Sequence, residues 1–153
     1  MASQESLQTV SKPVERAKAL LAIGEAYRHG GKQGEAIKHY TESRNLASIL
    51  GHVDCYLWSA LGLADSLFLL GELKESEALL TKLDGFVEEG NQRYPLEALH
   101  ISLSRAVISK VAGDNVDSEL DSLIAKYEML GVCWPRDYIA RIRVNDYSIP
   151  KGF

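Results

Sequence analysis

The chain has 153 residues, a formal net charge of −4 at pH 7 and 46% hydrophobic residues, which is the composition of an ordinary globular protein. A negative net charge disfavours general nucleic-acid binding, because phosphate groups are usually bound by basic surfaces, so we expect no nucleic-acid partner. The longest apolar run, residues 67–70, is far too short to span a bilayer, so we expect no membrane partner either.

The first half of the chain predicts a polar leader and then two helices. Residues 1–12 are rich in Ser and Gln and predict a flexible leader. Pro13 suits the first turn of a helix with Ser11 as its N-cap, and the apolar spacing that follows indicates a helix up to Gly30-Gly31. A second helix is predicted over 33–50, ended by Gly51.

The second half predicts five more helices and a short tail. Asp54 is the expected N-cap of a third helix, which extends to residue 70. Three helices are predicted over 74–89, 95–112 and 116–131. A short terminal helix is predicted to start at Pro135, and the tail after residue 145 is predicted to be irregular.

Three glycines show that the helices recur in pairs. Gly31, Gly71 and Gly113 are 40 and then 42 residues apart, and each lies between two helical segments. A period of this size is typical of stacked helical hairpins, because one hairpin cannot bury its apolar face alone. We therefore predict a leader at 1–12, a helical-repeat domain at 13–145 and a tail at 146–153. Within the repeat domain, the repeat units are expected at about 14–50, 54–90 and 95–130, followed by a cap at 134–145.

Equivalent positions of the three units carry small residues. We number each unit from residues 17, 57 and 99. The eighth position is then Gly24, Ala64 and Ala106, and the fifteenth is Gly31, Gly71 and Gly113. The twentieth position is Ala36, Ser76 and Ser118. Small residues allow two helices of one hairpin to approach closely. Larger residues are expected to fill the gaps, with Tyr27 against Tyr40 in the first unit.

This pattern resembles the tetratricopeptide repeat (TPR), with IGEAY at 23–27, the turn at Gly31, and then Ala36 and Tyr40. The resemblance implies an all-α fold, a right-handed α-solenoid of three helix-turn-helix hairpins with a C-terminal capping helix. The longer period is similar to the roughly 40-residue repeats of bacterial signalling regulators. The third unit departs from the pattern, with Ser109 and Ser122 where aromatic residues are usual.

The residues that carry chemistry form no recognisable catalytic pattern. The four histidines are scattered, no glycine-rich phosphate loop occurs, and the serines lie in predicted helices. We therefore expect a protein that is not an enzyme and has no cofactor and no bound metal. Cys55 and Cys133 are expected to be free thiols, and with no apolar signal segment in residues 1–12 they favour a cytoplasmic protein.

The resemblance also implies a binding surface for a protein or peptide partner. In tetratricopeptide arrays, positions two, five, nine and twelve of the first helix line the concave face. The corresponding residues are Lys18, Leu21, Glu25 and Arg28, then Trp58, Leu61, Asp65 and Phe68, then His100, Leu103, Val107 and Lys110. Trp58 and Phe68 fit a role as aromatic anchors in a groove, and they fit a place in the core equally well.

The function implied is an adaptor, a scaffold or a regulatory sensor that binds a peptide or helix of a protein partner in the groove. Two alternatives remain open from the sequence. The chain is a self-associating subunit that pairs through an open end of the array, or it is the sensor or C-terminal part of a larger multidomain signalling regulator.

Overall fold

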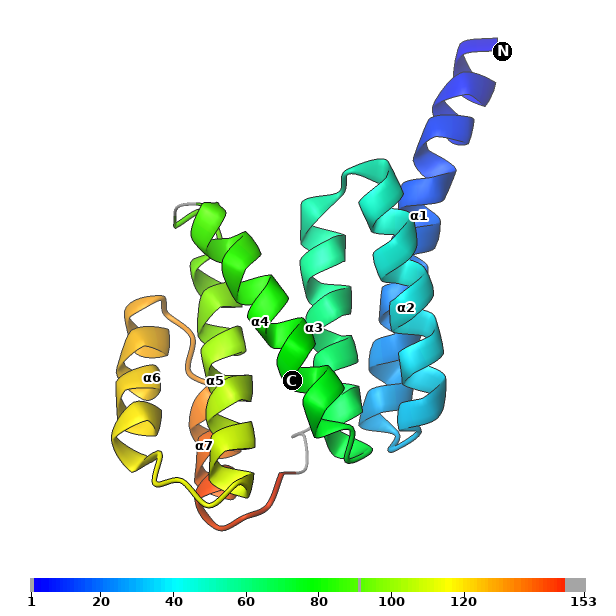
Figure 1. Cartoon of the computed structure of the whole chain (residues 1–153). Coiled ribbons are helices and arrows are strands. Elements are labelled where there is room, and N and C mark those ends of the chain that lie inside the picture. The colour runs from blue at the N-terminus through cyan, green and yellow to red at the C-terminus, as the bar shows by residue number, and fades with distance from the viewer. Residues whose placement is uncertain (1, 91, 148–153) are drawn as a thin grey trace. The chain divides into compact units, whose positions relative to one another are not determined.

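A computed structural model describes residues 2–90 and 92–147, with side chains described from residue 12 onward. Within these ranges the chain forms α-helices and no strand, so the all-α class is confirmed (Figure 1). The helices of the described ranges are α1 (Ala2–His29), α2 (Gln33–Leu50), α3 (Val53–Leu69), α4 (Leu73–Glu89), α5 (Pro95–Val111), α6 (Asp117–Met129) and α7 (Pro135–Arg143).

The start of the first helix differs from the prediction. α1 begins at Ala2, so Pro13 lies inside the helix and Ser11 is not its N-cap. Residues 2–12 include Gln, Glu, Leu and Lys, which have good helix propensity. A proline inside a helix removes one backbone hydrogen bond and does not oblige the helix to begin there.

The cap of α3 also differs. His52 is the N-cap, and its Nδ1 accepts a hydrogen bond of 3.2 Å from the backbone N–H of Cys55. Asp54, the predicted cap, lies instead in the first turn, where a negative charge suits the positive end of the helix dipole. Ahead of α6, Asn115 Oδ1 accepts from the N–H of Asp117 at 3.1 Å.

The three repeated glycines all adopt the left-handed conformation. Their φ angles are 78° at Gly31, 86° at Gly71 and 101° at Gly113, which residues with a Cβ rarely adopt. The spacing of 40 and 42 residues therefore marks three turns with a left-handed glycine, and Gly51 and Gly131, with φ angles of 67° and 75°, mark two more. Each turn joins two helices through a connection of a few residues.

Replacing Gly71 by leucine is expected to destabilise the chain by about 1–2 kcal/mol, because φ is positive there. Steric crowding does not contribute, since no atom lies within 4 Å of a Cβ added at Gly71. Urea unfolding followed by circular dichroism measures the change. Gly34→Leu is the control, because Gly34 has equally open surroundings without a positive φ, and an equal loss in both variants would refute this reason.

The chain divides into two compact units, residues 1–70 and 71–153. Unit 1 contains α1, α2 and α3, and α2 packs against both other helices. The first turns of α1 project beyond the end of α2 (Figure 1). The fully buried side chains of unit 1 are Ala17, Ala36, Tyr40, Ser43, Ala47, Leu57, Ser59, Ala60, Leu61, Ala64 and Ser66.

In unit 2, α4 packs against α5, α5 against α6, and α6 against α7. The predicted terminal helix is present, and its Ile139 and Ile142 are fully buried. Arg143 of α7 forms ion pairs with Asp117 and Asp121 of α6. α7 thus covers α6 with apolar side chains and holds it with charged ones.

The small residues predicted between the helices are largely buried. Gly24, Ala64 and Ala106 at the eighth position are all buried. At the twentieth position Ala36 and Ser76 are buried, whereas Ser118 is exposed. The predicted close approach at this position is therefore wrong for the third repeat, at about 95–130. No helix of the described ranges has the length and apolar character needed to cross a membrane.

Candidate functional site

Tyr40 is the largest buried side chain of unit 1, and two glycines make room for it. A Cβ added at Gly24 of α1 would lie 3.0 Å from Tyr40 Cδ1. One added at Gly62 of α3 would lie 2.8 Å from Tyr40 Oη and closer still to two ring carbons. The ring therefore lies against both backbones. Tyr27, predicted to pack on Tyr40, has its ring centroid 5.2 Å from that of His39.

A chain of polar contacts continues from the Tyr40 hydroxyl. Tyr40 Oη donates to Glu25 Oε1 at 2.7 Å, and Arg28 Nη2 donates to Glu25 Oε2 at 2.7 Å. Arg28 Nη1 then donates to Asp65 Oδ2 of α3 at 3.0 Å. Arg28 is only 5% exposed. We call Glu25, Arg28, Tyr40 and Asp65 the buried polar network; it joins all three helices of unit 1.

Burial and the neighbouring charges shift the pKa values of two members. Burial raises the pKa of Tyr40 well above its ordinary value, since a phenolate is poorly solvated there. Burial lowers the pKa of Arg28, but Asp65, Tyr40 and Glu25 together outweigh this effect and raise it. Arg28 is therefore charged and Tyr40 is neutral in the folded protein at neutral pH.

The shift at Tyr40 predicts a loss of stability in alkali. Above about pH 10 the unfolded chain loses the phenol proton that the folded protein keeps. Because of this group, the free energy of unfolding should then fall by up to about 1.4 kcal/mol per pH unit. Below that pH, Tyr40 should not make the free energy of unfolding depend on pH. Tyr40→Phe should lose about 1–2 kcal/mol near neutrality, from the missing donor to Glu25, but decline less steeply in alkali. Urea unfolding between about pH 8 and pH 11 measures both slopes, and equal slopes would contradict the assignment.

The predicted binding positions of unit 1 do not share one environment. Glu25, Arg28 and Asp65 belong to the buried polar network, a grouping that helical spacing did not reveal. Lys18 is exposed, and Leu21 packs partly buried against the cluster of Ala17, Ala47 and Cys55. The remaining positions are Trp58 and Phe68, both half-buried, and Leu61, which is buried.

The predicted positions of unit 2 are mostly interior. His100, Leu103 and Val107 of α5 are buried, and Lys110 is half-buried. The accessible side of α5 instead carries small side chains: Ala98, Ser102 and Ser109. The positions transferred from the tetratricopeptide repeat had indicated the other face.

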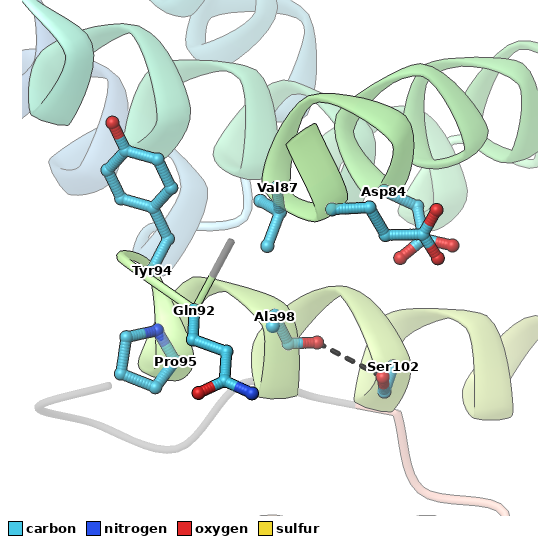
Figure 2. Close-up of a pocket in the computed structure, with 8 residues that line it drawn as sticks. Asp84, Val87, Gln92, Tyr94, Pro95, Ala98 and Ser102 are labelled. Carbon is cyan, nitrogen blue, oxygen red and sulfur yellow. Dashed lines mark hydrogen bonds between the residues drawn. The ribbon is translucent and has the colours of Figure 1, made fainter. Parts of the chain in front are cut away.

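A groove of about 540 Å³ lies between α4 and α5. Figure 2 shows Val87 pointing from α4 towards α5, with Tyr94 and Pro95 near the end where the two helices are joined. The residues that line this groove, which we call the α4–α5 groove, are Asp84, Val87, Glu88, Gln92, Tyr94, Pro95, Ala98 and Ser102.

Two contacts hold opposite ends of this groove. Arg105 of α5 donates to Asp84 Oδ2 and to Thr81 Oγ1, each at 2.9 Å, and so fixes the Asp84 carboxylate. The ring of Tyr94 lies against Gly90, and its centroid is 6.1 Å from that of Phe86. The groove is thus bordered by a positioned acid and a positioned aromatic ring.

A second groove, of about 500 Å³, lies on the α6 side of α5. Ser109 and Ser122, the two serines that replace aromatic residues of the resembled repeat, both line it. The sequence thus contained a signal for this groove, because side chains too small to fill the space between two helices leave that space open.

Among the described residues, no group of three or more His, Cys, Asp or Glu side chains is arranged to hold a metal ion. Cys55 is a buried free thiol and Cys133 an exposed one. Comparison of the chain with protein-family models, with curated proteins and with solved structures found no match.

Proposed function

We propose that the chain is a non-catalytic protein-interaction module, an α-solenoid of three tetratricopeptide-like hairpins that binds a peptide or helix of a protein partner. The observation that carries the proposal is the recurrence of one turn, with a left-handed glycine at residues 31, 71 and 113. The buried small residues at 24, 64 and 106 repeat with the same period. Stacked hairpins of this kind present an extended surface suited to peptide binding.

The partner surface in this proposal includes the accessible members of the predicted set. On unit 1, Lys18 is exposed, and Trp58 and Phe68 are half-buried. Aromatic side chains with partial exposure are typical anchors of protein interfaces, because they bury a large area at small entropic cost. Adaptor, scaffold and regulatory sensor are all roles of such a surface, and a cytoplasmic location fits each of them.

The proposal is tested by affinity capture from an extract of the source cells. We expect the chain to retain a protein that mass spectrometry identifies, and the purified pair to re-form the complex. Trp58→Ala should weaken this binding by about tenfold, the usual effect of removing one anchor. The control is Lys38→Ala, because the Lys38 side chain is exposed on α2 and lies outside the predicted surface.

The thermal midpoint of each variant completes this test. A drop of several degrees in Trp58→Ala, without a specific loss of binding, would place Trp58 in the core and contradict its proposed role as an anchor. Equal retention of the partner by Trp58→Ala and Lys38→Ala would contradict this surface. The proposed function would be contradicted if the chain retained no protein that forms a complex with it again after both are purified.

Self-association is a second candidate, favoured by apolar side chains at the end of unit 2. Met129 is 86% exposed and Val144 is 73% exposed, and Trp134 is partly exposed beside them in sequence. Light scattering of the purified chain tests this candidate. A dimer that Met129→Ser and Val144→Ser dissociate, but Ile49→Ser does not, would support it, since Ile49 is equally exposed on unit 1.

A further inference from the structure

We infer that the α4–α5 groove accepts a basic side chain, lysine or arginine, of the protein partner. This inference rests on the proposed function and specifies the chemistry of the partner. It depends on three features that coincide in the groove: an apolar floor, two carboxylates on one wall and an aromatic ring at one end.

The floor suits the aliphatic stem of a long basic side chain. Val87, Pro95 and Ala98 provide apolar surface between the two helices. Lysine and arginine commonly bury their methylene groups along such a surface while the charged end remains near polar groups. The small size of Ala98 and Ser102 keeps the groove open along α5.

The wall formed by α4 supplies the charge. Asp84 and Glu88 are four residues apart on α4 and both line the groove. Arg105 already engages Asp84, whereas Glu88 is exposed and forms no ion pair with any residue in the described ranges. A guest cation would therefore meet one pre-positioned carboxylate and one that has no counter-charge.

The end of the groove adds neutral groups that favour a cation. The Tyr94 ring is held against Gly90 and near Phe86, and the face of such a ring attracts a guanidinium or ammonium group. The Gln92 side chain and the Ser102 hydroxyl also line the groove and supply acceptor oxygens.

The charge of the surrounding unit favours the same guest. Residues 71–153 contain ten Lys and Arg but fourteen Asp and Glu, whereas residues 1–70 contain seven of each. A basic segment is thus attracted to unit 2, and an acidic one is repelled.

The test is a titration of the ¹⁵N-labelled full chain with Nα-acetyl-arginine N-methylamide, followed by amide chemical shifts. We expect saturable shifts at Gln92, Tyr94, Ala98 and Ser102, with a dissociation constant of about 1 mM, as befits a single side chain. Glu88→Gln should weaken binding about fivefold. Glu89→Gln should not, because Glu89 is the next residue of α4 and does not line the groove.

Two shorter probes with the same blocked backbone separate charge from apolar contact. The norleucine and glutamate analogues should cause no saturable shifts in these residues. Equal shifts from the norleucine analogue, equal effects of Glu88→Gln and Glu89→Gln, or no saturable shift with the arginine probe would each overturn the inference. If a captured partner binds wild type and Glu88→Gln equally, this site is wrong while the proposed function stands. If the arginine probe binds as expected but no partner is captured, it is the proposed function that fails.

Discussion

Gly62→Ala is expected to lower the free energy of unfolding by about 3 kcal/mol, the upper part of the range for overpacked cores. The added Cβ would overlap the ring and hydroxyl oxygen of Tyr40, which is fully buried. Two further contacts restrict any movement of Tyr40, because its ring also lies against Gly24 and its hydroxyl is bound to Glu25. Urea unfolding followed by circular dichroism measures the loss.

Two further variants show whether the loss arises from this contact. Gly85→Ala should stabilise the chain by up to about 1 kcal/mol, because Gly85 lies inside α4 with no atom near an added Cβ. Tyr40→Leu should be less harmful in the Gly62→Ala background than in wild type, since the shorter side chain relieves the overlap. A Gly62→Ala protein as stable as wild type would show that α3 does not approach Tyr40 this closely.

Arg28→Met is expected to destabilise the chain by about 3 kcal/mol, the lower end of the range for breaking a buried ion pair, because the Arg28 side chain is 4% exposed but those of Glu25 and Asp65 are 32% and 16% exposed. Methionine retains an apolar chain but leaves the Glu25 and Asp65 carboxylates without their shared guanidinium. Two like charges, both only partly exposed, then remain on α1 and α3 without the cation between them. The same urea unfolding experiment measures this loss.

The matched control is Arg105→Met in unit 2. Arg105 also pairs with an aspartate, Asp84, at 2.9 Å, but the two side chains are 40% and 37% exposed. Exposed pairs of this kind usually contribute less than about 1 kcal/mol. If Arg28→Met cost no more than Arg105→Met, burial would not govern the strength of the Arg28 network.

The helices and turns could be predicted from the sequence because their signals are local. Glycine at 31, 71 and 113 and proline at 95 and 135 act on the backbone within a few residues, and α2 was predicted with its observed bounds. The start of α1 was wrong because helix propensity over residues 2–12 outweighed the proline at 13.

The buried polar network could not be predicted in this way. Arg28 and Asp65 are 37 residues apart, and their contact depends on how α1 and α3 approach each other. Gly62 was not recognised as a packing residue, since its role appears only when Tyr40 of α2 lies beside it. Family spacing assigned Glu25, Arg28 and Asp65 to an open face, whereas Arg28 is buried and binds both acids.

The accessible face of α5 could not be predicted from the sequence either, because it is determined by tertiary packing. The positions transferred from the tetratricopeptide repeat placed Leu103 and Val107 on a binding surface, whereas both are buried, because the repeat pattern does not show which side of α5 its neighbours cover. The serines at 109 and 122 were the one sequence signal for open space beside α5. The α4–α5 groove could be located only once the packing of α4 against α5 was known.

The most direct test of the proposed function is titration calorimetry between the purified chain and a peptide segment of its captured partner, with the masses of both recorded before and after. We predict saturable one-to-one binding by the segment alone, with a dissociation constant of about 1 μM to 100 μM, and both masses unchanged. Failure of every segment of the captured partner to bind, or a change in the mass of the partner, would contradict a non-catalytic peptide-binding module.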